Sequence, residues 1–297
     1  MTVAVLANPF AGKGRHRGLL PALVDRLGAA GHTVRPLPAR TREEAQEACH
    51  TAVADGASAL VAMGGDGTVH LALQAVAGTD VALGVVPVGT GNDFAAAVGV
   101  PLEPMAAVEA CVRALREGTG ARVDLARISA PGGGQRWFGA VLAAGFDAVV
   151  NERANRMRWP RGDRRYDIAI FRELVGLRPR SYTLRLDGTE HRVEAVLVAV
   201  GNTPSYGGGM RICPGADPTD GLLDVVVGGP LTRTQLIRLK PRVYSGTHIA
   251  HPLVTTYQAS TVEIVADRIT GYADGERTLP LPVTVTSAPG ALRVLTP

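Results

Sequence analysis

Glycines, one acid and one hydroxyl are concentrated in the run Gly64-Gly65-Asp66-Gly67-Thr68, between an apolar run and a helical pattern. Glycine allows close backbone approach and positive φ, and the start of a helix presents N–H groups that lack intrahelical acceptors. Such a loop suits a phosphate. A carboxylate beside phosphates repels them unless a cation or a proton transfer gives it a role. The run therefore predicts a phosphate-binding loop in which Asp66 does more than hold an anion.

Two further glycine-rich runs, Asn8–Gly14 and Pro87–Phe94, also follow apolar segments. In the second, Thr90 and Asn92 offer side-chain hydrogen bonds, and Asp93 has the alternative of capping the short helical turn after it. The first run is not a Walker A loop, because no Ser or Thr follows its Gly-Lys pair. The absence of a G-x-G-x-x-G fingerprint there argues against a dinucleotide-dependent dehydrogenase.

The first 120 residues alternate between strand and helix patterns, which predicts a doubly wound α/β domain with a parallel sheet. We expect Thr41 to be the N-cap of the second helix. Ligands of such sheets bind outside the carboxyl ends of the strands, where all three glycine-rich loops fall. The expected strands are 3–7, 34–37, 59–63 and 81–86, and the expected helices are 18–30, 42–54, 69–76 and 104–116.

From residue 122 onward the patterns are mostly those of strands, with a hairpin signal at Asp187-Gly188. This half predicts a larger, antiparallel, β-rich domain of the sandwich or barrel type. We place the α/β domain at 1–121 and the β-rich domain at 122–289, with 290–297 able to return to the first domain. The expected strands are 123–128, 136–142, 182–186, 192–199, 222–227, 261–265 and 291–295.

Length and composition fit a folded protein: the chain has 297 residues, of which 46% are hydrophobic and 20% charged. No apolar run reaches the roughly 18 residues of a membrane span. The N-terminus reads as a strand and not as a signal peptide. The cysteines Cys49, Cys111 and Cys213 are odd in number and lack metal-binding spacing, so we expect buried free thiols and a cytoplasmic location.

The chain has a net charge of +4, and the segment Asn151–Arg165 alone, with six arginines and two acids, also has a net charge of +4. An anionic membrane surface is one partner for the Arg153–Arg165 stretch, since each basic residue contributes about 1 kcal/mol there. A solvated arginine-rich loop is the alternative. Nucleic acid is disfavoured because no nucleic-acid-binding signature accompanies the arginines.

The combination Asn8-Pro9-x-x-Gly12, Gly64–Thr68 and Gly89-Thr-Gly-Asn-Asp93 resembles the diacylglycerol kinase catalytic-domain family, and looks closest to its soluble bacterial lipid kinases. The resemblance implies a nucleotide-binding α/β domain, a larger β-rich domain and an active site in the cleft between them. It also implies an enzyme that uses ATP and Mg²⁺ to phosphorylate a lipid hydroxyl.

Carried over residue by residue, the resemblance gives a set of nucleotide-contacting positions. His70 departs from the pattern, because many relatives carry a small or amide residue there. The implied nucleotide-binding residues are Asn8, Pro9, Gly12, Lys13, Gly14, Thr41, Gly64, Gly65, Asp66, Gly67, Thr68, Val69, His70, Thr90, Gly91 and Asn92.

The resemblance also assigns the acids. Glu276, in Asp274-Gly275-Glu276, is implied as the general base, and Asp66 lies near the metal and the transferred phosphoryl group. A Mg²⁺ is implied at the Asp220 side chain with the backbone of Asp217 and Leu222, and Asp124 links it to the catalytic site. The structural alternatives are a surface or capping acid for Asp124, an Asx turn at Asp220, and a plain hairpin turn at Asp274-Gly275.

The sequence thus favours an ATP-dependent lipid kinase acting on diacylglycerol at a membrane surface, with peripheral membrane association. A sphingoid or other lipid is an alternative acceptor. Two further candidate functions are an NAD kinase, which shares Gly-Gly-Asp-Gly-Thr, and a catalytically silent nucleotide or lipid sensor. We infer no nucleic-acid partner and no stable protein partner, and a homodimer is left open.

Overall fold

The computed structural model describes residues 1–8, 18–157 and 164–296, without the side chains of 164–167. The chain forms two compact units. The first unit comprises Met1–Leu125, Pro218–Asp220 and Ala288–Pro297, and the second comprises Ala126–Asp217 and Gly221–Ser287. The chain therefore passes between the units several times.

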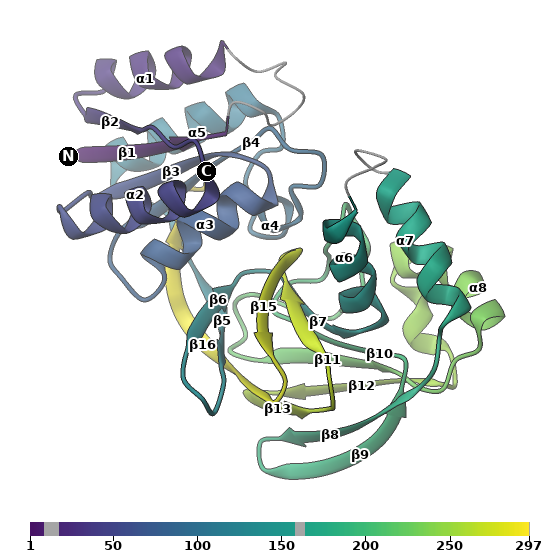
Figure 1. Ribbon diagram of the computed structural model, residues 1–297. Helices are drawn as coiled ribbons and strands as arrows, with labels where there is room; N and C mark the ends of the chain where they lie inside the picture. Colours follow the sequence, from purple (N-terminus) through teal and green to yellow (C-terminus); the bar gives the residue numbers. More distant parts are fainter. Residues whose placement is uncertain (9–17, 158–163, 297) are drawn as a thin grey trace. The chain divides into compact units, whose positions relative to one another are not determined.

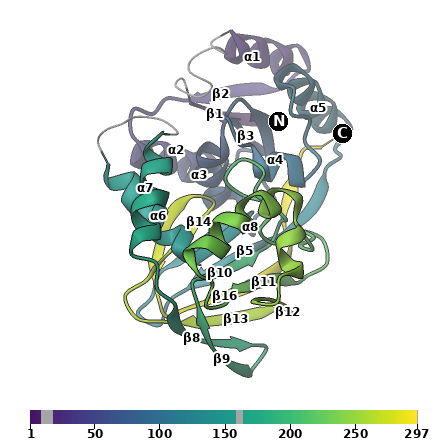
Figure 2. The same cartoon turned by 90° about the vertical axis from the view of Figure 1, so that its right-hand side faces the viewer.

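The first unit is built on a parallel sheet in the order β2-β1-β3-β4, with the last strand, β16, added beside β4 through Val294. Helices α1 and α5 cover one face, and α2 and α3 cover the other (Figures 1 and 2). The doubly wound prediction is confirmed. The elements are β1 (Thr2–Ala7), α1 (Leu19–Ala29), β2 (Thr33–Leu37), α2 (Arg42–Ala54), β3 (Ala59–Gly64), α3 (Asp66–Val76), β4 (Ala82–Pro87), α4 (Asp93–Ala97), α5 (Pro104–Glu117) and β16 (Val283–Val294).

The second unit is an antiparallel sandwich. One sheet follows the order β12-β11-β10-β7-β14-β15, and the other pairs β13 with the N-terminal part of β16 and with β8, which pairs with β9. Its strands are β5 (Ala121–Ser129, from Ala126 on), β6 (Gln135–Phe138), β7 (Val141–Gly145), β8 (Arg180–Leu186), β9 (Thr189–Ala195), β10 (Leu197–Gly201), β11 (Leu223–Gly228), β12 (Val254–Ala259), β13 (Thr261–Val265), β14 (Thr270–Ala273) and β15 (Glu276–Pro280).

The inner strands β7 and β10 of the six-stranded sheet are buried on both faces. Alternate residues such as Leu142 and Val198 enter the core between the sheets, whereas their neighbours Val141 and Leu197 pack on the outer layer. This follows from the two-residue period of a strand. The outer layer includes helix α8 (Arg233–Ser245), which the sequence patterns do not predict.

Helices in the second unit are the main departure from the sequence prediction. They are α6 (Phe146–Arg156), α7 (Arg164–Val175), α8 (Arg233–Ser245) and the short 3₁₀ helix η2 (Thr247–Ala250). Two predicted strands are also wrong in extent. The segment 136–142 is divided into β6 and β7, and 192–199 is divided into β9 and β10, which lie in different sheets.

The three cysteines are free and buried, as predicted. Burial raises the pKa of Cys49 and of Cys111 to about 12 each. These thiols are therefore packing groups and not nucleophiles.

Candidate active site

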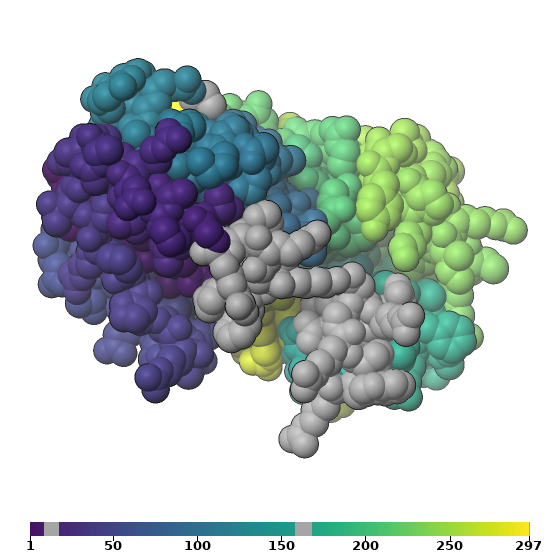
Figure 3. Space-filling view, turned by 90° about the horizontal axis from the view of Figure 1, so that it is seen from above, coloured from purple at the N-terminus to yellow at the C-terminus, as the bar shows by residue number. Residues whose placement is uncertain are grey.

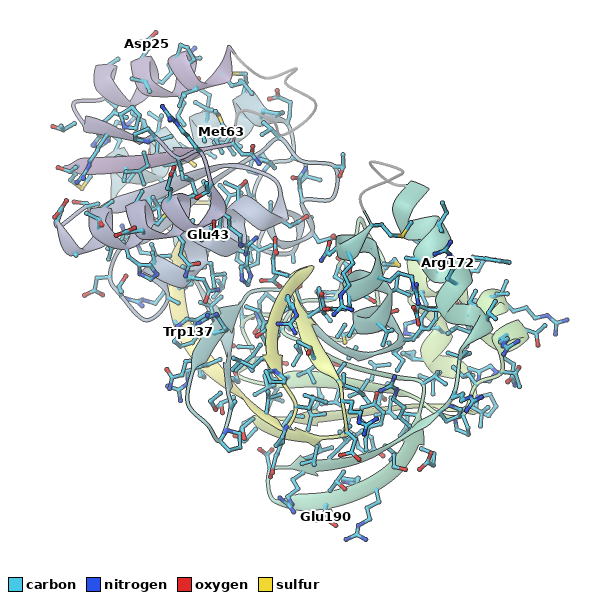
Figure 4. The ribbon with its side chains drawn as sticks, in the orientation of Figure 1. Asp25, Glu43, Met63, Trp137, Arg172 and Glu190 are labelled. Carbon is cyan, nitrogen blue, oxygen red and sulfur yellow. The ribbon has the colours of Figure 1, made fainter. Side chains whose placement is uncertain are left out.

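The carboxyl ends of β1, β3 and β4 meet at one edge of the first unit's sheet. The N–H of Asn8 donates to the carbonyl of Met63 at 2.9 Å, and the N–H of Val88 donates to the carbonyl of Gly64 at 3.0 Å. Figure 4 labels Met63 near this end of β3. The strand order changes direction between β1 and β3, and ligands of open α/β sheets bind outside such a point.

Gly64, the first glycine of the loop after β3, has no room for a side chain. A Cβ on Gly64 would lie 2.1 Å from Oγ1 of Thr68, a buried side chain in the first turn of α3. Gly65 is the extended N-cap of α3 and makes no side-chain cap. The first N–H groups of an α-helix lack intrahelical i−4 acceptors, so the N-terminus of α3 lies where an anion would be favoured, although the Thr68 N–H already donates to the Gly65 carbonyl at 2.8 Å.

The loop after β4 packs backbone against backbone on the loop after β3. A Cβ on Gly89 would lie 2.5 Å from Cα of Gly65, and one on Gly65 would lie 3.1 Å from Cα of Gly89. Asn92 adopts a left-handed conformation with φ 59°. Its side chain closes the loop, since Oδ1 accepts from the Gly89 N–H at 3.1 Å and Nδ2 donates to the Gly89 carbonyl at 3.2 Å.

Asp66 joins the two loops through its carboxylate. One oxygen accepts from the N–H of Asn92 at 2.8 Å, and the other accepts from the N–H of Phe94 at 3.4 Å. The structure places Asn92 at the N-cap of α4 and makes Asp93 the first residue of the helix, which corrects the capping prediction for Asp93. The acid that the sequence places among phosphates thus also anchors the start of α4.

The remaining predicted positions of the first unit differ in setting. Thr41 is the N-cap of α2, as predicted, and its hydroxyl accepts from the Glu44 N–H at 3.2 Å. Thr90 is exposed, whereas His70 is 6% exposed and its ring lies 3.4 Å from the side-chain amide of Gln74. A nucleotide contact of His70 stays a prediction. Four predicted positions, Pro9, Gly12, Lys13 and Gly14, lie outside the described residues.

In the second unit, Asp274 and Gly275 form the tight turn between β14 and β15. Both have positive φ, 53° and 80°, and Ala273 pairs with Glu276 across the turn. The Asp274 carboxylate accepts from the N–H groups of Gly139 and Ala140 at 3.0 and 2.8 Å. The turn therefore fixes Glu276 as the half-exposed first residue of β15.

Known proteins match the chain over its whole length. The diacylglycerol kinase catalytic domain matches residues 2–128, and the YegS C-terminal NAD kinase beta sandwich-like domain matches residues 140–296. A protein of Mycobacterium tuberculosis (strain ATCC 25618 / H37Rv) named diacylglycerol kinase is 44% identical, over 99% of this chain and 95% of the relative.

The chain belongs to the diacylglycerol kinase family. A protein of Stenotrophomonas maltophilia (strain K279a), named "Probable lipid kinase YegS-like", is 31% identical over 83% of this chain and 81% of the relative. A crystal structure of a diacylglycerol kinase from Bacillus anthracis str. Sterne has a TM-score of 0.72 at 21% identity, covering 100% of this chain and 97% of that chain. This structural likeness shows the fold. The predicted enzyme class, a phosphotransferase with an alcohol acceptor, agrees with the family membership.

The metal ligands implied for this diacylglycerol kinase family member are divided between the units. Asp124 is 4% exposed in the first unit, where its N–H donates to the Pro218 carbonyl and its carboxylate accepts from the Gly290 N–H, both at 2.7 Å. Carboxylate and carbonyl oxygens are the donors Mg²⁺ prefers, so the residue types fit. Among the described residues, no group of three or more His, Cys, Asp or Glu side chains is placed to hold a metal. The set Asp217, Asp220, Leu222 and Asp124 stays a prediction.

The arginine segment is only partly described in this family member. Arg153 forms an ion pair with Glu173, and Arg156 forms one with Glu152. Arg158 and Arg161 lie outside the described residues, as do the side chains of the last two arginines of the segment. In the described part of the chain, no helix is both long and apolar enough to cross a membrane.

The sequence analysis does not identify the contacts of two carboxylates of the second unit, those of Asp274 and Asp147. The sequence identifies Asp274 only as a turn residue, and its contacts with Gly139 and Ala140, in the connection between β6 and β7 more than 130 residues earlier, leave no sequence signal. Asp147, at the start of α6, accepts from the buried Tyr206 hydroxyl, and burial raises the pKa of the Asp147 carboxyl. The one hint in the sequence for this pair is the position of Asp147, two residues after Gly145, the glycine that ends the buried strand β7.

Proposed function

We propose that the protein is an ATP-dependent lipid kinase that transfers the γ-phosphoryl group to the hydroxyl of diacylglycerol, giving phosphatidate. The observation that carries the proposal is the junction of the two glycine loops. Gly65 and Gly89 are in backbone contact and Asp66 binds the second loop, beside the N-terminus of α3. The name of the 44% identical relative supports the choice of acceptor.

The chemistry requires mostly positioning, because phosphoryl transfer demands little covalent work from the protein. The rigid glycine loops would hold the nucleotide phosphates with backbone N–H groups. A lipid hydroxyl is a weak nucleophile at neutral pH, so a carboxylate must take its proton as the bond to phosphorus forms. We assign this proton transfer to Glu276. Mg²⁺ would neutralise charge at the phosphates, near Asp66. A Mg²⁺ at the Asp220 side chain and the backbone of Asp217 and Leu222 would be mainly structural and regulatory, with Asp124 linking it to the catalytic site.

Asp66 has a separate role in this proposal. Its carboxylate accepts from two backbone N–H groups of the second loop, so the side chain has a fixed orientation and keeps that loop in place. We therefore assign Asp66 to the organisation of metal and phosphates and leave proton abstraction to Glu276.

The experiment incubates the purified chain with radiolabelled ATP, Mg²⁺ and diacylglycerol in mixed micelles and resolves the lipids by thin-layer chromatography. Labelled phosphatidate is the expected product. A total lipid extract in a parallel reaction finds another lipid acceptor. Turnover that persists in Glu276→Gln would reject the assigned base while leaving the lipid kinase activity in place.

NAD is the second acceptor to test, because the matching C-terminal domain is described as NAD kinase beta sandwich-like. Labelled NADP with no labelled lipid would replace the proposal with an NAD kinase activity. ATP binding without turnover on either acceptor would favour a sensor. Each outcome is read from the same purified chain, so the three functions are distinguished in one series.

A further inference from the structure

Helix α8 carries apolar side chains on the side that faces solvent. Its buried side packs Leu239 into the outer core of the second unit, together with the half-buried Leu236 and Val243. On the opposite side, Ile237 is 56% exposed and Tyr244 is 47% exposed. These two residues are seven apart, or two helical turns, and Pro241 lies between them on the same face. A surface helix ordinarily places polar residues there.

Cations flank this apolar ridge on both sides. Arg238 and Lys240 are exposed, and within the described residues neither takes part in an ion pair. The surrounding sequence is free of acids, since no Asp or Glu occurs from Val225 to Val262 while four residues there are Arg or Lys. The space-filling view shows α8, in yellow-green, at the surface of the second unit (Figure 3). The ridge is therefore apolar at its crest and cationic at its sides.

Neighbouring helices extend the same character. The Arg233 guanidinium donates to the Val175 carbonyl and so connects the start of α8 to the end of α7. On α7, Phe171 is 70% exposed and Val175 is 59% exposed, four residues apart on one face, with the exposed Arg172 beside them (labelled in Figure 4). Five of the seven large apolar side chains that are exposed on the described part of the chain belong to α7, α8 and η2.

We propose that the α8 ridge, defined as Ile237, Arg238, Lys240, Pro241 and Tyr244, docks the protein on an anionic lipid bilayer. The apolar crest would enter the interface between headgroups and acyl chains, and the flanking cations would meet anionic headgroups. Charge complementarity selects this occupant, because an acid-free stretch with four cations disfavours a second copy of the same surface. The surface lies outside the Arg153–Arg165 segment.

The inference gives the proposed lipid kinase a route to a bilayer substrate but does not depend on its activity. Vesicle binding is measured without ATP, and kinase activity is measured on diacylglycerol dispersed in micelles. A failure of one assay therefore leaves the other interpretable.

The first experiment measures co-flotation of the full chain with phosphatidylcholine vesicles that contain or lack phosphatidylglycerol. We expect binding to the anionic vesicles only, and a decrease with added salt. The double variants Ile237→Ser/Tyr244→Ser and Arg238→Glu/Lys240→Glu should each bind about tenfold more weakly or worse. The matched control is Leu102→Ser/Arg113→Glu, which alters an exposed apolar residue and an exposed cation of the first unit and should bind like the wild type.

The second experiment places a reporter on the crest. Tyr244→Trp should gain blue-shifted emission, relative to the wild-type spectrum, that brominated lipids quench, whereas Leu102→Trp should not. Equal binding to neutral and anionic vesicles, or binding that the ridge variants leave unchanged, would overturn the proposal. Self-association of the wild type that Ile237→Ser/Tyr244→Ser abolishes, without vesicle binding, would assign the ridge to a second copy instead and equally reject the membrane assignment.

Discussion

The loop after β3 in the first unit and the β14–β15 turn in the second each carry an aspartate whose carboxylate accepts two backbone N–H groups from another segment of the same unit. Asp66 holds Asn92 and Phe94, and Asp274 holds Gly139 and Ala140. In the first loop the anchoring acid is also the one proposed to organise phosphates. In the second, the anchor and the proposed base, Glu276, are separate residues. Anchoring and chemistry can therefore be separated by mutation in the second unit but not in the first.

The largest effect is expected for Glu276→Gln. Removal of a general base lowers turnover by about 10² to 10⁴-fold. The melting temperature should stay near that of the wild type, because Glu276 is half-exposed and the amide keeps its size. Turnover is measured on micellar diacylglycerol, with Glu190→Gln on the distant β8–β9 hairpin as the matched control. Near-normal turnover of Glu276→Gln would show that Glu276 is not the base, and Asp274 and Glu276 could then no longer be assigned separate roles as anchor and base.

Gly89→Ala tests the junction of the two loops. Its Cβ would lie 2.5 Å from the backbone of Gly65, which cannot rotate away as a side chain can. We expect a loss of about 1–3 kcal/mol in the free energy of unfolding and weaker ATP binding. Gly28→Ala is the control, since a Cβ there meets nothing within 4 Å and alanine favours the α1 helix by about 0.5–1 kcal/mol. Unchanged nucleotide affinity in Gly89→Ala would mean that the loop contact does not shape the nucleotide site.

Asp274→Asn and Asp187→Asn separate anchoring from chemistry. Asp187 occupies a similar Asp-Gly turn, with φ 45°, and its carboxylate accepts from the N–H groups of Ser260 and Thr261. Asn tolerates the same positive φ but places an NH₂ group against one donor. We expect Asp274→Asn to lose about 1–3 kcal/mol of stability and the exposed Asp187→Asn to lose less, whereas only Asp274→Asn should lower turnover. Urea unfolding and the micelle assay measure the two effects, and equal turnover in both variants would show that Asp274 does not position Glu276.

The sequence was sufficient for the first unit's sheet and for the loops after β3 and β4, because short apolar runs before glycines carry a strong local signal. It also located α2, whose N-cap Thr41 is read from residue type. It was insufficient for the helices of the second unit. Ile237 and Tyr244 are apolar but exposed, so the apolar residues of α8 do not follow a simple helical periodicity. The arginines at the end of α6 are typical of a solvated loop. The partners of Asp66 and Asp274 were beyond reach, since backbone N–H groups distant in the chain leave no trace in residue type.

The smallest effect concerns the pH dependence of the Asp187 anchor. Hydrogen bonds from Ser260, and then from Thr261, lower the pKa of the Asp187 carboxyl below its ordinary value of 3.8. A lowered pKa stabilises the fold at pH values above 3.8, and this stabilisation is lost as the pH falls through the folded-state pKa. The stability gap between wild type and Asp187→Asn should therefore be widest at neutral pH and should narrow below 3.8. The carboxyl is largely exposed, so solvent screening keeps the effect small and added salt should reduce it further. Urea unfolding across this range measures the gap. A gap that stays constant with pH would assign the Asp187 contribution to turn geometry and not to its charge, and would weaken its use as the match for Asp274.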